Sequence, residues 1–217
     1  MTVSRTQSFF ERYAVDFDSL YGNASGPLQR FVNQVFRKSM WLRYEKSLEG
    51  CMPIEGMSVL DVGCGPGHYG VSLAQAGAAS VMGLDFSEDM LRIAAERART
   101  AGVAERCEFV SSDFMRFTGD AKFDYVIVMG FMDYMADPAA VVSKVLSLAR
   151  RRAFFSFPVS GGLLAWQRKL RYSSRCELYM YSREDLTRLF APFGDFDVRI
   201  EPIARDFFVT AERRRGA

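Results

Sequence analysis

From residue 57 onward, short apolar runs alternate with stretches of helical character, and this alternation restricts the fold more than any other feature of the sequence. Five runs have the length of strands, namely Ser58–Val62, Ser80–Asp85, Cys107–Ser111, Tyr125–Met129 and Ala153–Phe157. The segments at about residues 68–76, 88–101 and 138–149 are long enough for helices. Strands and helices that alternate at this spacing are typical of βαβ units, which build a parallel sheet covered on both faces. Right-handed crossovers then determine most of the topology.

The two ends of the chain depart from this alternation. Residues 5–21 carry apolar side chains at helical spacing, and Pro27 begins a second helix that is predicted to run to about Gly50. Near the C-terminus, Asp197–Glu201 and Phe207–Ala211 are predicted to be strands of an antiparallel hairpin that turns at Pro202. We therefore predict an α/β, Rossmann-like fold whose seven-stranded sheet is mostly parallel with an antiparallel C-terminal strand, with helices on both faces and an N-terminal helical cap.

Composition narrows the class of protein. Of the 217 residues, 49% are hydrophobic and 25% charged, which excludes a disordered chain. The uncharged stretch between Asp61 and Asp85 is interrupted by glycines and Pro66, so no integral membrane segment is expected. Charged residues near the N-terminus leave no secretory signal, and we expect a cytoplasmic protein. No metal site or disulfide framework is expected, because there is one histidine and no C-x-x-C pair among the cysteines Cys51, Cys64, Cys107 and Cys176.

Charge is distributed unevenly along the chain. Residues 53–149 carry 7 basic and 13 acidic side chains, a net charge of −6, whereas residues 1–52 and 150–217 carry net charges of +2 and +6. A bound cation in the middle section and an anionic partner at the flanks would both be consistent with this pattern, and so would an ordinary solvated surface.

A glycine-rich loop follows the first strand. The run Val59–Gly67 contains Gly63, Gly65 and Gly67, and glycine is needed where the backbone turns sharply and a ligand approaches closely. The pattern from Gly65 to Gly70 also fits G-x-G-x-x-G, with Asp85 further along, so a dinucleotide site must be considered. In a dinucleotide-binding site the first glycine of this pattern follows the strand directly. Here Gly63 occupies that place and the pattern begins only at Gly65, which argues against a nicotinamide-dependent reductase. Asp61 would also repel a pyrophosphate but would favour a cationic ligand.

At this point the chain resembles the class I S-adenosylmethionine-dependent methyltransferases. The matching motifs, in order, are Val59–Gly67, Gly83–Leu91, Ser112–Phe114 and Phe123–Val128, which together cover about residues 55–160. The resemblance implies S-adenosylmethionine as cofactor and S-adenosylhomocysteine as product. It divides the chain into a cap of residues 1–52 and a cofactor-binding domain of residues 53–217, with a substrate-side insertion at residues 158–182.

The resemblance also implies roles in binding the cofactor. Asp85 would accept hydrogen bonds from the ribose hydroxyls, and Asp113 would accept one from the adenine amino group. Asp61 would order the glycine loop near the ammonium group. The full set of expected cofactor-binding residues is Tyr13, Tyr21, Asp61, Gly63, Cys64, Gly65, Gly67, Asp85, Phe86, Met90, Asp113, Phe114 and Met129. In this set Phe86 and Met90 would sandwich the purine, and the Phe114 amide would donate to the ring. For Tyr13 and Tyr21, anchoring of the cap by aromatic burial is an equal alternative.

Methyl transfer from a sulfonium is an in-line displacement, so proximity and desolvation can supply most of the acceleration and a general base is optional. The candidates for catalytic contact are Asp133 and Tyr134, which follow the fourth strand, and His68 in the glycine loop. Asp133 is the stronger candidate for contacting the acceptor. His68 is more simply explained as packing against the cofactor.

The acceptor is expected to be a small molecule. Arg37, Arg168 and Arg171 are predicted to bind it, joined at a basic rim by Lys38, Arg43 and Lys169, which favours an anionic acceptor. No Asn-Pro-Pro-Tyr sequence follows the fourth strand, so a nucleic-acid substrate is not expected. The cap and the insertion also resemble those of magnesium-protoporphyrin methyltransferases, which esterify a carboxylate. Oxygen is favoured as nucleophile; the alternatives are N-methylation of a small metabolite and a non-catalytic, cofactor-binding regulatory subunit. The sequence carries no signal for an oligomeric state.

Overall fold

The computed structural model describes residues 27–119, 121–161 and 178–216, and for residues 27–37 the backbone only. One seven-stranded sheet runs through this part of the chain in the order β3-β2-β1-β4-β5-β7-β6. Its strands are β1 (Ser58–Val62), β2 (Ser80–Asp85), β3 (Cys107–Ser111), β4 (Phe123–Val128), β5 (Ala149–Pro158), β6 (Phe196–Ile203) and β7 (Asp206–Arg213). β1 to β5 pair in parallel, whereas β7 lies antiparallel between β5 and β6. The predicted fold is confirmed.

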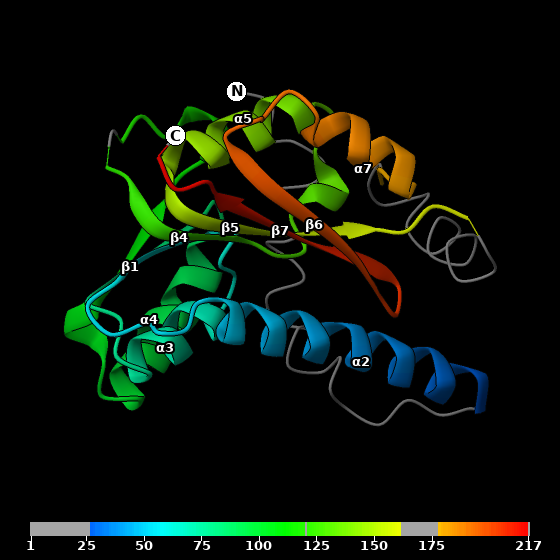
Figure 1. Cartoon of the computed structure of the whole chain (residues 1–217). Coiled ribbons are helices and arrows are strands. Elements are labelled where there is room, and N and C mark those ends of the chain that lie inside the picture. Colours follow the sequence, from blue (N-terminus) through cyan, green and yellow to red (C-terminus); the bar gives the residue numbers. More distant parts are fainter. Residues whose placement is uncertain (1–26, 120, 162–177, 217) are drawn as a thin grey trace.

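Helices cover both faces of the sheet (Figure 1). One face carries α2 (Pro27–Gly50), α3 (His68–Gln75) and α4 (Glu88–Thr100), and the other carries α5 (Pro138–Leu148) and α7 (Arg183–Phe190). Short 3-10 helices lie in the loops: η2 (Ala104–Arg106), η3 (Phe114–Arg116) and η4 (Met132–Tyr134). Two of these, η3 and η4, follow the carboxyl ends of β3 and β4, where ligands of open α/β sheets bind.

Each face of the sheet has its own hydrophobic core, because successive residues of a strand point to opposite sides. In β1, Leu60 and Val62 join the core beneath α5 and α7, whereas Val59 joins the core shared with α3. In β5, Phe155 lies in the first of these cores and Phe154 in the second. Two-sided burial explains why the strands of the sequence are continuous apolar runs.

Side-chain caps set the starts of the helices. Ser87 Oγ accepts a hydrogen bond from the Met90 N–H and so begins α4, and the Asp137 carboxylate caps α5 at the Ala140 N–H. At α7, Ser182 and Asp185 form a reciprocal capping box. These polar residues stand immediately before apolar periodic stretches, which is why the helix starts were visible in the sequence.

Several bounds differ from the expectation: β4 is Phe123–Val128 and not Tyr125–Met129, and larger differences occur at the hairpin and at β5. The hairpin does not turn at Pro202, which lies inside β6 opposite Phe207; the chain turns after Ile203, and Ala204 takes a positive φ of 48°. A proline is tolerated there because β6 is the edge strand of the sheet. β5 begins at Ala149, before the apolar run.

The residues by which β5 extends beyond the apolar run are mostly charged. Its first residues include Arg151 and Arg152, which form ion pairs with Asp124 of β4 and Glu212 of β7. A search for apolar runs does not find the start of a strand whose first residues are charged and form ion pairs with neighbouring strands. The predicted helix at residues 5–21 lies outside the described residues.

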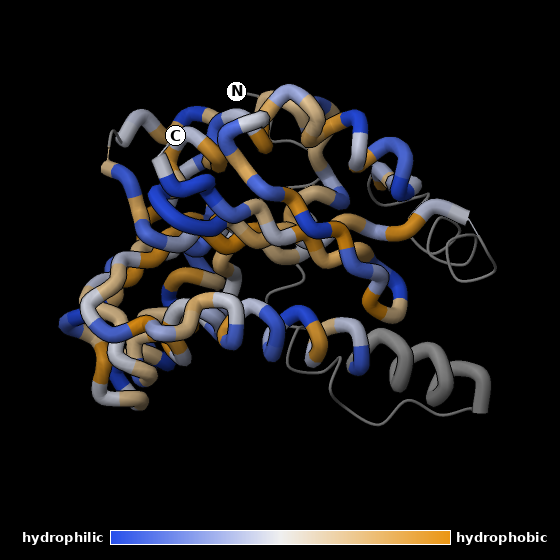
Figure 2. The backbone as a smooth tube through the Cα atoms, in the orientation of Figure 1, coloured by the Kyte–Doolittle hydropathy of each residue, from blue (hydrophilic) through white to orange (hydrophobic). Residues whose placement is uncertain are grey.

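In the described half of α2 the most deeply buried side chains are polar, whereas Leu42 and Leu48 pack partly buried against the core. Ser39, Arg43 and Ser47, spaced four residues apart, are all buried. Figure 2 shows hydrophilic and apolar residues mixed along this helix. Within the described ranges, no helix is both long and apolar enough to cross a membrane.

Candidate functional site

Three glycines shape the loop between β1 and α3, each in a different environment. Gly63, Gly65 and Gly67 have positive φ angles of 67°, 50° and 75°. A Cβ on Gly63 would lie 2.8 Å from Phe131 Cδ2, and one on Gly67 would lie 2.9 Å from Ala94 Cβ. A Cβ on Gly65 would meet no atom within 4 Å. The loop is therefore packed at both ends and borders open space at its middle, where a ligand can approach the backbone.

Hydrogen bonds hold this loop against β2 and α4. The Leu84 carbonyl accepts from the N–H groups of Gly63 and Cys64, at 2.8 and 3.0 Å. From α4, Arg97 Nε donates to the Pro66 carbonyl at 2.9 Å. Cys64 is buried, and burial raises the pKa of its thiol, so it is a packing residue and not a nucleophile. Because its backbone is already anchored, the loop needs no rearrangement to present its open middle.

Asp61, in β1, is a buried carboxyl group next to the loop. It is 2% exposed, and burial raises its pKa to about 7, partly offset by a hydrogen bond from the Gly70 N–H. Its Oδ2 atom accepts no hydrogen bond from the described residues. A cation bound nearby would favour the ionised form of this group, so the site suits a ligand that carries a positive charge.

Asp85, at the end of β2, connects the loop to the sheet. Its Oδ2 accepts a hydrogen bond from the Gly65 N–H at 2.9 Å, and its Oδ1 accepts one from the Ser87 N–H at 2.9 Å. Burial raises the pKa of Asp85, and the hydrogen bonds from backbone amides act in the opposite direction. The residue expected to hold the ribose thus also supports the open middle of the loop.

The predicted adenine segment lies after β3. Asp113 is exposed and caps η3 by accepting from the Met115 N–H at 2.9 Å, whereas Phe114 is buried. The remaining expected cofactor residues lie on neighbouring elements: Phe86 is half-buried after β2, Met90 is buried in α4, and Met129 is buried after β4. The structure therefore brings the loops after β1, β2, β3 and β4 to the same edge of the sheet.

Sequence reasoning missed two residues that organise this edge. Phe131 packs its ring against Gly63 and meets Phe114 edge to face, with ring centroids 6.1 Å apart. Lys144 of α5 donates hydrogen bonds to backbone carbonyls of the adenine segment. Neither residue belongs to a motif; Phe131 could have been found only as an aromatic in the segment after the fourth strand.

The residues after β4, which are expected to contact the acceptor, include a buried acid. Asp133 in η4 is 2% exposed, and its carbonyl accepts from the Tyr179 N–H at 2.9 Å. Burial and the nearby Asp133 charge raise the pKa of Tyr181 to about 12, so this phenol stays protonated at neutral pH. Tyr134 is half-buried in the same 3-10 helix.

Arg43 does not belong to the expected basic rim. It is buried, and its Nε donates to Asp206 Oδ2 at 3.0 Å, an oxygen that also accepts from Ser39 Oγ. Burial alone would lower the pKa of Arg43, but the charges of Asp206 and Asp133 raise it overall. The guanidinium therefore ties α2 to the start of β7 and lies beside the segment after β4. An arginine that is paired in this way cannot capture a soluble anion.

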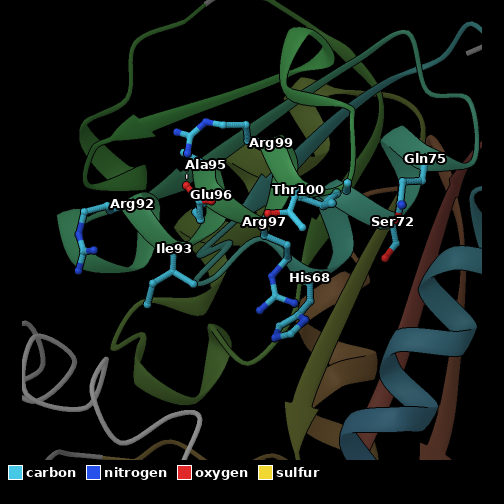
Figure 3. Close-up of a pocket in the computed structure, with 12 residues that line it drawn as sticks. His68, Ser72, Gln75, Arg92, Ile93, Ala95, Glu96, Arg97, Arg99 and Thr100 are labelled. Atoms are coloured by element: carbon cyan, nitrogen blue, oxygen red, sulfur yellow. Dashed lines mark hydrogen bonds and ion pairs between the residues drawn. The ribbon is translucent and has the colours of Figure 1, made fainter.

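His68 lies at the start of α3 and faces a cavity of ≈ 780 Å³ between α3 and α4 (Figure 3). Arg92, Arg97 and Arg99 also line this cavity, but Asp61, Asp85 and Asp133 do not. The cavity is therefore separate from the edge where the expected cofactor residues meet. His68 therefore lies in the wall of this cavity, and its expected packing against the cofactor stays a prediction.

Several expected site residues cannot be located. Tyr13, Tyr21, Arg168 and Arg171 lie outside the described residues, and of Arg37 only the backbone is described. The described part of the candidate site therefore comprises the residues expected to bind the cofactor and those after β4 expected to contact the acceptor.

Similarity to known proteins agrees with this geometry. The curated relatives include ubiquinone biosynthesis O-methyltransferases from Ralstonia nicotianae, 35% identical over 50% of this chain and 46% of the relative, and from Methylococcus capsulatus, 35% identical over 45% and 40%. The chain thus spans less than half the length of these relatives. Among solved structures, magnesium protoporphyrin IX methyltransferase from Synechocystis PCC 6803 with bound SAH has a TM-score of 0.78 at 22% identity, covering 96% of this chain and 98% of that one. That likeness shows the fold.

The family itself follows from a direct match. A family model described as "Methyltransferase domain" matches residues 54–163, about half of the chain, and includes the glycine loop, Asp85 and the segments after β3 and β4. The chain therefore belongs to the methyltransferase domain family, as a class I S-adenosylmethionine-dependent methyltransferase domain.

Proposed function

We propose that this protein transfers the methyl group of S-adenosylmethionine to an oxygen nucleophile on a small, anionic acceptor. The observation that carries the proposal is the pairing of an open glycine loop at Gly65 with a buried carboxyl group at Asp61. Together they offer room for a ligand beside the backbone and a negative charge for its ammonium group. The curated relatives named above are O-methyltransferases, which supports oxygen as the nucleophile.

Each part of the edge would have one task. Asp85 would accept hydrogen bonds from the ribose, and Asp113 with the Phe114 amide would hold the adenine. When bound, the cofactor supplies a methyl group on a sulfonium; the acceptor oxygen bonds to that carbon while the carbon–sulfur bond breaks and its electron pair stays on sulfur. Asp133 would orient the acceptor and take up the proton of a hydroxyl nucleophile, if that proton is still present.

The N-terminal residues 1–52 would act as a cap over the acceptor side, with Tyr13 and Tyr21 near the cofactor, and residues 158–182 would form the opposite wall. The anchor for the cap is the buried pair between Arg43 of α2 and Asp206 of β7. Arg37, Arg168 and Arg171 come from these two segments and would bind carboxylate or phosphate groups of the acceptor.

Calorimetry with S-adenosylhomocysteine and NADH tests the cofactor, and a metabolite screen that detects release of S-adenosylhomocysteine tests the reaction. We expect the protein to bind S-adenosylhomocysteine but not NADH. In the screen we expect turnover with an acceptor that carries a hydroxyl or carboxyl group. Turnover only with amines would replace oxygen by nitrogen as the nucleophile. Binding without turnover of any acceptor would point to a regulatory subunit, and binding of NADH would contradict the proposal.

The anionic acceptor has its own test. Neutralising Arg168, Lys169 and Arg171 together should raise the KM for the acceptor found in the screen and leave S-adenosylhomocysteine affinity unchanged. The increase should be smaller at high salt, which screens exposed charges. An unchanged KM at both salt concentrations would show that these charges are only solvated surface.

A further inference from the structure

Lys144 makes an unusual set of contacts for a lysine on a helix surface. Its Nζ donates hydrogen bonds to the carbonyl oxygens of Phe114, Met115 and Phe117, at 2.7, 3.1 and 2.5 Å. An ammonium group has three N–H donors, so all of them are used. The three carbonyls belong to η3 and to the residue that follows it. A single side chain of α5 therefore holds the carbonyl end of this short helix through three hydrogen bonds.

The same ammonium group also holds the aromatic side of the segment. It lies 5.0 Å from the centroid of the Phe114 ring, within the range of a cation–π contact. The Phe114 ring meets Phe131 edge to face, and Phe131 in turn packs on Gly63 of the glycine loop. A continuous series of contacts thus runs from α5 through the adenine segment to the loop that would hold the methionine part of the cofactor.

The opposite end of η3 is held by Asp113. Its Oδ1 accepts from the Met115 N–H, and its Oδ2 lies 3.8 Å from Arg116 Nε in an exposed ion pair. Desolvation lowers the pKa of Lys144, and the charge of Asp113 partly offsets this effect. Because the segment is only three residues long, the two ends cannot move independently: displacing the carbonyls that Lys144 holds would also displace the Asp113 carboxylate and the Phe114 amide.

We infer that Lys144 is a positioning residue that sets the preference of the cofactor pocket for adenine. It holds the Asp113 carboxylate and the Phe114 N–H where they can read the amino group and the ring nitrogen of the base. The inference rests on the proposed function, specifically on adenine binding beside Asp113 and Phe114. It assigns to α5, which covers the opposite face of the sheet from α3, a part in recognising the cofactor.

The test compares two ligands that differ in the base alone. S-adenosylhomocysteine carries the amino group, and S-inosylhomocysteine carries a carbonyl group in its place. We expect the unmodified protein to prefer S-adenosylhomocysteine by about tenfold to a hundredfold in calorimetry, the worth of one or two hydrogen bonds to a charged group. In Lys144→Met the preference should fall below about threefold, mainly through weaker binding of S-adenosylhomocysteine.

Three further variants separate recognition from folding. Lys144→Arg keeps the charge and the donors and should retain most of the preference; Lys144→Gln keeps neutral donors and should give an intermediate ratio, which can be measured even if the methionine variant does not fold. Lys122→Met removes the same charge from an exposed position and should leave the ratio unchanged. Thermal unfolding of each variant shows how much of any change in affinity reflects folding.

The outcomes are distinguishable. If both ligands bind more weakly to Lys144→Met and Lys144→Gln by the same factor, Lys144 has only a structural role and the inference is wrong. An unchanged ratio in these variants, or no preference in the unmodified protein, overturns it as well. If the unmodified protein binds neither ligand, the proposed function itself fails.

Discussion

The part of the site expected to bind the cofactor and the part expected to receive the acceptor are built in different ways. Around the glycine loop, the polar contacts run between backbone groups and nearby side chains; Asp85, for example, receives the Gly65 amide from 20 residues earlier. On the acceptor side, the central contact is Arg43 to Asp206, which are 163 residues apart and buried. The geometry of a site made of backbone donors is set by the local conformation of the chain. The geometry of a site made of side chains distant in sequence depends on how helices and strands pack against one another.

This difference has a consequence for how each half can change. The backbone amides of the glycine loop are present whatever the neighbouring side chains are, so this half can serve one cofactor in many proteins. The part expected to receive the acceptor depends instead on individual side chains from α2, η4 and β7. If these roles hold, a substitution there would change which acceptor fits, whereas the glycine loop would keep its shape.

The largest effect is expected on the acceptor side. Arg43→Met removes the partner of Asp206 and leaves a carboxylate buried without its charge partner, which should lower the free energy of unfolding by about 3–5 kcal/mol. Lys46→Met is the matched control, because Lys46 forms a partly exposed pair with Glu201 at 3.2 Å, a type of pair worth about 0–1 kcal/mol. Urea unfolding measures both. A loss below about 1 kcal/mol for Arg43→Met would show that the pair does not anchor α2.

A matched pair of glycine variants probes the cofactor half. Gly65→Ala and Gly67→Ala both place a side chain at positive φ, at a cost of about 1–2 kcal/mol each. Gly67→Ala also pushes its Cβ against Ala94, so its total loss of stability should be about 2–4 kcal/mol. Gly65→Ala should instead lose affinity for S-adenosylhomocysteine, because its Cβ points into open space. If both variants lost the same affinity and the same stability, Gly65 would not border the ligand any more closely than Gly67 does.

Asp61 should make the stability of the ligand-free protein depend on pH. Its pKa is about 7 in the folded chain against an ordinary value of 3.8, so between these values the folded state binds more protons than the unfolded state. Stability should therefore fall as the pH rises, by about 2–3 kcal/mol between pH 5 and pH 7.

Asp61→Asn isolates this effect. The variant should lose that part of the slope, be more stable than the unmodified protein above pH 7, and bind S-adenosylmethionine more weakly there. Denaturant unfolding at several pH values and calorimetry provide the measurements. If the free energy of unfolding depended on pH in the same way in both proteins, burial would not raise the pKa of Asp61.

Asp85→Ala should have the smallest of these effects and should act on binding. Removing the carboxylate takes away the ribose acceptors and the support of the Gly65 amide, which should weaken S-adenosylmethionine binding by about 1.5–3 kcal/mol. Asp89→Ala, at an exposed position in the first turn of α4, is the control and should leave affinity unchanged. Unchanged affinity in Asp85→Ala would place the ribose elsewhere.

The local pattern of apolar and polar residues was sufficient to predict much of the fold. The bounds of β1, β2 and β3 agree with the sequence prediction, because each is an apolar run that ends at a polar or glycine-rich turn. The prediction was wrong where the position of a strand in the sheet and its neighbours decide the outcome: Pro202 continues β6 because β6 is the edge strand, and β5 begins with arginines that pair with acids of its neighbours.

The same division applies to the site. The glycine loop, Asp61, Asp85 and Asp113 could be named from the sequence, since their spacing relative to the strands places them at one edge of a parallel sheet. Lys144 and the burial of Arg43 could not, because a basic residue on a helix looks the same in the sequence whether it faces water, backbone carbonyls or a buried acid.

The sequence by itself thus determined the βαβ order, because it depends on short-range periodicity. It also indicated the family and its cofactor, through the resemblance of four motifs in the right order. Only the tertiary structure decided which charges are buried and paired. Arg43 became an anchor through Asp206, and Lys144 became a support of η3, because contacts between residues so far apart in the chain exist only after the elements have packed.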